Sequence, residues 1–163
     1  MSEPTRRGLP ALGPRGEGWV AIQVVLFALL GVAAVLGPEW PDAVERPFLG
    51  SASVLGLAGV VLFVGGLVRL GAQLTPFPKP VEGGTLREDG VYGLARHPIY
   101  GGGALLAICW TLATSYLGLV PTALLGLLIE AKSRREEAWL VEHHPGYEAY
   151  RARVRRRFIP FLW

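Results

Sequence analysis

The sequence GVYGLARHPIYGGG, residues 90–103, joins a polar segment to an apolar one and decides how the chain is arranged. Pro98 suits the first turn of a helix, because its fixed φ angle and missing N–H are tolerated there. Arg96, His97 and Tyr100 then lie where that helix enters an apolar medium. Free N–H groups and the positive end of the helix dipole favour an anion at such a position. The stretch therefore predicts an anion-binding helix start at a membrane surface.

The composition indicates a membrane protein of one domain. The chain has 163 residues, of which 51% are hydrophobic and 18% are charged, whereas a soluble domain has about 25% charged residues. The net charge of +3 does not indicate nucleic-acid binding, because the basic residues lie beside apolar runs and no nucleic-acid motif is present. Cys109 is the single cysteine, so an intramolecular disulfide is excluded and we expect a buried thiol.

Four apolar runs predict an all-α integral membrane protein. The expected spans are about 18–36, 48–68, 98–114 and 117–131. A full span needs about 20 apolar residues. The last two runs are shorter, so we expect a helical hairpin with its turn near residues 115–118. Residues 1–17 are expected to be a disordered leader, and residues 18–163 a single membrane domain.

The distribution of basic residues predicts the orientation. Lysine and arginine number three in the leader, one in the loop 37–47, four in the connection 69–97 and eight after Glu130. An even number of spans places leader, connection and tail on one side, which the positive-inside rule makes the cytoplasm. In the tail, 132–163, we expect a basic surface helix at 147–157 ahead of an apolar end that docks at the membrane interface.

Two adjacent carboxylates, Glu136 and Glu137, follow the last apolar run. The simplest interpretation is a solvated helix face on which they pair with the two arginines that precede them. The predicted topology, however, places them on the same side of the membrane as Arg96, His97 and Tyr100. A pocket with a cationic entrance and an acidic wall would bind a zwitterionic ligand.

Other chemistry finds less support in the sequence. His97, His143 and His144 match no common zinc spacing, so no metal is expected. Cys109 has no neighbouring base, and no GxGxxG follows a strand. The sequence assigns no catalytic residue.

The patterns GxYxxxRHPxYxG (residues 90–102), REExxL (135–140) and YxxY (147–150) resemble the isoprenylcysteine carboxyl methyltransferase family and the related phospholipid methyltransferases. The resemblance covers roughly residues 69–162. It implies a methyltransferase at the cytoplasmic membrane surface that uses S-adenosylmethionine on a small or lipid-like acceptor with a carboxylate, amine or thiol. The chain lacks the additional spans of larger members, so the resemblance does not name the acceptor.

Carried onto this chain, the resemblance implies a set of cofactor-binding residues. They are Arg96, His97, Tyr100, Gly102, Glu136 and Glu137. The methionine carboxylate would meet Arg96 and the helix start, and an acid would take the ribose hydroxyls or the amine. If Arg96, His97 and Glu137 line one pocket, Glu137→Gln should weaken cofactor binding by roughly 1 kcal/mol or more and leave stability nearly unchanged.

Two alternatives remain open at this stage. One is a membrane reductase with a nicotinamide cofactor, because sterol-reductase-like proteins resemble this C-terminal architecture. In that case residues 155–157, three consecutive arginines, would read the 2′-phosphate. The other is a non-enzymatic membrane scaffold. Besides the membrane lipids, we expect a small-molecule or lipid-like partner and no nucleic acid.

Overall fold

The computed structural model describes residues 9–163, so the first eight residues of the expected leader lie outside it. In this part of the chain the helices are α1 (Glu17–Leu36), α2 (Asp42–Leu70), α3 (Pro98–Ala113), α4 (Leu119–His143) and α5 (Tyr147–Arg153). Short 3-10 turns lie at η1 (Gly71–Gln73), η2 (Gly90–Gly93) and η3 (Tyr116–Gly118). Residues 9–163 contain no strand, and the predicted all-α class is confirmed.

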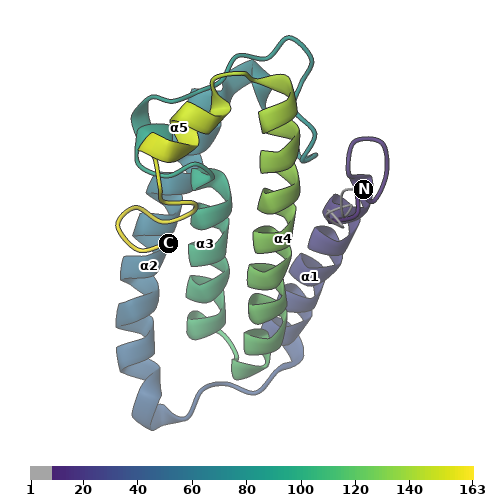
Figure 1. The fold of residues 1–163 in the computed structure, drawn as a ribbon. Coiled ribbons are helices and arrows are strands. Elements are labelled where there is room, and N and C mark those ends of the chain that lie inside the picture. Colours follow the sequence, from purple (N-terminus) through teal and green to yellow (C-terminus); the bar gives the residue numbers. More distant parts are fainter. Residues whose placement is uncertain (1–8) are drawn as a thin grey trace, which may run out of the picture.

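The four long helices stand side by side in the order α2, α3, α4, α1 (Figure 1). The link between α1 and α2 and the turn η3 lie at one end of the bundle. The connection 71–97 and α5 lie at the other end, together with the segment before α1, because Lys79 N–H donates to the Arg15 carbonyl oxygen. The long polar connections therefore meet at a single end of the bundle.

The surface of the bundle is suited to lipid. Three helical stretches are long and apolar enough to cross a membrane, namely Glu17–Leu36, Asp42–Gln73 and Tyr116–His143. Their outer faces carry large apolar side chains such as Val35, Leu57 and Leu127, which are 81%, 70% and 69% exposed. α3 has 16 residues and reaches about 24 Å, short of a hydrocarbon core of about 30 Å. Three helices, rather than the expected four, therefore meet the length of a full span.

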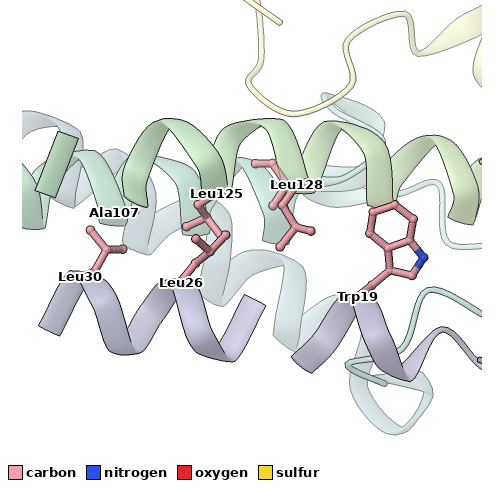
Figure 2. Packing of buried hydrophobic residues seen from close by; sticks show 7 residues of the cluster. Trp19, Leu26, Leu30, Ala107, Leu125 and Leu128 are labelled. Carbon is pink, nitrogen blue, oxygen red and sulfur yellow. The ribbon is translucent and has the colours of Figure 1, made fainter. Parts of the chain in front are cut away.

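The apolar core lies between α1 and α4. Trp19, Leu26 and Leu30 of α1 pack against Leu125 and Leu128 of α4 (Figure 2). Ala107 of α3 completes the cluster from behind. This packing fixes α1 against α4 at a distance from α2.

α2 and α3 pack more closely than the other helices, because glycines line their contact. A Cβ atom at Gly102 would lie 2.5 Å from the Phe63 backbone nitrogen and 2.7 Å from the Gly59 carbonyl oxygen. Small residues allow such an approach between membrane helices. Gly102 is therefore a packing residue in this structure.

Two helix boundaries differ from the expected ones. α2 begins at Asp42 rather than near 48, since the Pro41 carbonyl accepts from the N–H groups of residues 44 and 45 and the acids of the first turn complement the helix dipole. α4 continues to His143 as one helix, in agreement with a last span that extends past Glu130 into water. α5 ends at Arg153 rather than 157, because the carbonyls of residues 154 and 155 accept hydrogen bonds from the Arg96 side chain.

Candidate functional site

The start of α3 is held in place by the C-terminal tail. His97 precedes the helix and Pro98 occupies its first turn, as the sequence predicts. The Arg96 N–H donates to the Arg156 carbonyl at 3.0 Å, and the His97 N–H donates to the Arg157 carbonyl at 2.7 Å. A Cβ at Gly101 would lie 2.1 Å from the Phe158 carbonyl oxygen. The absence of a side chain at Gly101 therefore lets α3 approach the backbone of the C-terminal tail closely.

Arg96 connects α3, α4 and the tail. Its side chain is 6% exposed, and its Nε donates to Glu137 Oε1 at 2.9 Å. Its Nη1 donates to the carbonyls of Val154 and Arg155 at 2.8 and 2.9 Å. The guanidinium thus has partners on two elements that are far apart in the sequence.

Glu137 lies at the centre of a buried cluster of charges. Its side chain is 6% exposed, and its Oε1 lies 3.2 Å from His97 Nε2 and 3.4 Å from Arg157 Nε. The expected solvated face is therefore wrong for this residue. The two arginines before the acids make other contacts, because Arg134 pairs with Glu130 and the Arg135 guanidinium lies 4.1 Å from the centroid of the Trp139 ring.

Glu136 lies on a different face of α4 and contacts Tyr100. The Tyr100 hydroxyl donates to Glu136 Oε2 at 2.6 Å, and His97 Nδ1 lies 3.8 Å from Glu136 Oε1. The rings of His97 and Tyr100 stack with centroids 5.5 Å apart. The Glu136 side chain is 25% exposed, so it remains reachable for a ligand.

A cavity of about 490 Å³ lies at this end of the bundle. Its walls come from α1, α2, α3, α4 and the connection after α2, and most of them are apolar. Of the six predicted site residues, Arg96, His97, Tyr100 and Glu136 line the cavity. Gly102 faces α2 and Glu137 faces the charge cluster, so these two lie outside the lining.

Two polar residues of the cavity wall escaped the sequence analysis. Lys132 of α4 is 2% exposed, and its Nζ donates to Gln23 Oε1 at 2.8 Å and to the Pro76 carbonyl at 3.0 Å. The same Nζ lies 5.0 Å from the centroid of the Tyr100 ring. A signal was present, because Gln23 is a lone amide inside the first apolar run.

The cavity also receives cations from the connection after α2. Lys79 and Arg87 belong to its lining, and neither takes part in an ion pair among residues 9–163. The arginines of residues 155–157, expected to read a phosphate, do not line it. Arg157 instead donates to Glu130 Oε1 at 2.6 Å.

Buried tyrosines surround the site on the side of α5. Burial raises the pKa of Tyr92, Tyr147 and Tyr150, so their hydroxyls stay protonated. The Tyr150 hydroxyl donates to the Tyr92 carbonyl at 2.7 Å. The Tyr147 hydroxyl is buried at the cavity and has no hydrogen-bond partner in the described chain. A buried hydroxyl without a partner is unfavourable, which makes it a candidate ligand contact.

The residues 9–163 offer no metal centre. No three side chains of histidine, cysteine, aspartate or glutamate come together there as a metal site. His143 Nδ1 lies 2.7 Å from the Trp139 carbonyl oxygen of its own helix. The polar groups of the cavity are instead suited to an organic ligand with anionic groups.

Comparison with known proteins gives a partial similarity to a curated protein. No family model matches the chain. A stretch of 85 residues is 29% identical to the Delta(14)-sterol reductase TM7SF2 of Mus musculus, covering 50% of this chain and 20% of that protein. The chain thus matches about a fifth of the length of this relative.

The comparisons correct the assignment made from motifs. The resemblance to the isoprenylcysteine carboxyl methyltransferase family is wrong, since the similarity found is to a sterol reductase and no family model supports a methyltransferase. The structure gives a physical reason why the motif misleads. Gly102 and Glu137, which belong to it, make packing and ion-pair contacts within the chain itself.

Proposed function

We propose that this chain is a membrane-embedded reductase of the sterol-reductase type that binds NADPH in the cavity at the start of α3. The partial similarity to a mouse Delta(14)-sterol reductase supports the proposal. So does a bundle whose outer surface is apolar, because a lipid-soluble substrate can reach such a protein from the bilayer.

The observation that carries the proposal is the division of the cavity into a cationic and an apolar part. Lys79 and Arg87 line it from the connection outside the bundle, without carboxylate partners among residues 9–163. Charged hydrogen bonds from lysine and arginine are well suited to phosphate groups. Farther in, Phe27 of α1 and Phe63 of α2 belong to the lining. Such walls suit a flat ring and an apolar substrate.

The residues between these two parts fit a dinucleotide. The Glu136 carboxylate can accept hydrogen bonds from ribose hydroxyls or from an amide, and the Tyr147 hydroxyl can donate to a ligand oxygen because nothing else in the described chain accepts from it. When bound, the reduced nicotinamide supplies a hydride. When the hydride adds to one atom of a substrate double bond, the other atom needs a proton, and the Tyr100 hydroxyl is one of the proton-bearing groups at the cavity wall.

Calorimetric titration of the detergent-solubilised chain with NADPH, NADH and S-adenosylhomocysteine tests the proposal. We expect micromolar binding of NADPH, weaker binding of NADH and a loss of about tenfold in NADPH affinity in Arg87→Ala, since one charged phosphate contact is removed. Arg155→Ala is the matched control, because Arg155 is exposed and lies outside the cavity lining. Binding of S-adenosylhomocysteine alone, or of none of the three ligands to folded protein, would overturn the proposal.

A further inference from the structure

Lys132 places a cation deep in a predominantly apolar wall. It lies within the membrane-length helix Tyr116–His143 and lines the cavity, with 2% of its surface exposed. One and two helical turns earlier on α4, Ile129 and Leu125 line the same cavity. The Phe27 ring and Val24 of α1 line it beside Gln23. The ammonium group therefore stands at the polar end of an apolar passage.

The ammonium group makes no direct ion pair among residues 9–163, although the Glu136 carboxylate one turn later on α4 acts on it electrostatically. No acid lies within 4.0 Å of Lys132 in the described chain. Its contacts are the neutral oxygens of Gln23 and Pro76 and the face of the Tyr100 ring. Glu136, one turn later on α4, is instead bonded to the Tyr100 hydroxyl. Burying an ammonium group without a directly paired carboxylate is unfavourable, and ionisable residues inside a membrane helix commonly serve a ligand.

We infer that Lys132 binds the anionic head of an amphiphilic substrate whose hydrocarbon part lies along Ile129, Leu125 and Phe27. A carboxylate or a phosphate monoester on a long apolar chain has the required chemistry, since the head meets the cation and the tail meets apolar walls. A neutral head would leave the ammonium group without a directly paired anion. Calling this acid a substrate rests on the proposed function, whereas its binding to Lys132 does not involve NADPH.

Quenching of tryptophan fluorescence by a dibrominated fatty acid, compared with its methyl ester, tests the inference. Trp19 belongs to the same buried cluster as Leu125 and Ile129 of the cavity wall, so a tail bound along these residues is close to an indole. Acid and ester share the same tail and partition similarly into neutral detergent, so the ratio of their affinities isolates the head group. We expect the unsubstituted chain to bind the acid about tenfold tighter than the ester, the effect of one charged hydrogen bond.

Three variants separate a binding role from a structural one. Lys132→Met should lose the preference for the acid, whereas Lys132→Arg should retain most of it. Arg155→Met is the matched control, because it removes an exposed cation outside the cavity lining and should leave the preference intact. Competition by a long-chain alkyl phosphate and by a long-chain carboxylate distinguishes the two possible heads.

Other results would overturn the inference. If acid and ester bind the unsubstituted chain equally, no anion site exists at Lys132, and this comparison needs no variant to fold. If Lys132→Met weakens both ligands equally and keeps their ratio, Lys132 only holds the Pro76 segment against α1. A failure of NADPH binding leaves these outcomes unaffected, so the two proposals fail separately.

Discussion

Two pairs of sequence neighbours at the cavity end of the bundle show how differently adjacent residues are used. On α4, Glu137 is buried with Arg96 and His97, whereas Glu136 lines the cavity and bonds Tyr100. On α3, Gly102 touches the backbone of α2, whereas Gly103 lines the cavity.

The difference arises because one helical residue turns the side chain by about 100°. In each pair one residue holds the bundle together and its neighbour faces the ligand space. A motif that contains both residues of a pair therefore mixes the fold with the site. Substitutions within each pair should separate stability from binding.

The largest effect is expected from Glu137→Gln. Removing one charge of a buried pair leaves Arg96 without its partner, which should lower the free energy of unfolding by about 3 kcal/mol. This expected loss is larger than the one predicted from the sequence, where Glu137 was regarded as a cofactor contact and its substitution was expected to leave stability nearly unchanged. Thermal unfolding in detergent measures the effect, with Glu142→Gln as a control because Glu142 is exposed on the same helix. An unchanged unfolding midpoint would show that the cluster does not stabilise the fold.

Alanine substitutions of the two neighbouring glycines should change the free energy of unfolding in opposite directions. Gly102→Ala forces a methyl group against the backbone of α2, which cannot rotate away, and should destabilise the protein by about 1–3 kcal/mol. At Gly103 the nearest atom to an added Cβ is Phe63 Cε2 at 4.0 Å, so alanine should stabilise the helix by up to about 1 kcal/mol. Thermal unfolding of the two variants in parallel tests the comparison, which equal losses would contradict.

Glu136→Gln should affect binding more than stability. The side chain is partly exposed and accepts a hydrogen bond from the Tyr100 hydroxyl. A glutamine oxygen can accept the same hydrogen bond. We expect a stability change below about 0.5 kcal/mol and an NADPH affinity lowered by about fivefold, which corresponds to about 1 kcal/mol. Calorimetry on the folded variant measures the affinity, with Glu148→Gln as the control. A stability loss equal to that of Glu137→Gln would remove the distinction between the two acids.

The remaining comparison concerns the tyrosines beside the cavity, which should cause a loss of stability in alkali. Burial raises the pKa of Tyr92, Tyr147 and Tyr150 above the ordinary value of 10.0. The unfolded chain therefore loses these protons first, and the stability that they contribute is complete below pH 10 and declines as the pH rises further. Unfolding midpoints between neutral and strongly alkaline pH measure the decline in stability, and Tyr150→Phe should make this decline shallower. If the midpoint of the variant falls with pH as steeply as that of the unsubstituted chain, Tyr150 does not contribute to the decline.

Much of the architecture was predictable because it depends on local properties of the chain. Apolar runs separated by polar segments specify helices in a membrane, and Pro98 marks the start of α3. The helix α2 was predicted too short, since hydropathy does not detect the polar first turn at Asp42. The short α3 leaves three helices among residues 9–163 that are long and apolar enough to cross a membrane, where four spans, the last two as a hairpin, were expected.

The site was predictable only in part. The sequence by itself determined the helical class and brought Arg96, His97, Tyr100 and the two acids to one end of the bundle, because spacing along helices and polarity are properties of the chain. Tertiary structure alone decided which acid is buried, which glycine touches α2 and that Lys132 reaches Gln23 and Pro76. These contacts join residues that are from 39 (Phe63 and Gly102) to 109 positions apart, and their geometry follows from how the helices pack, which no local pattern encodes.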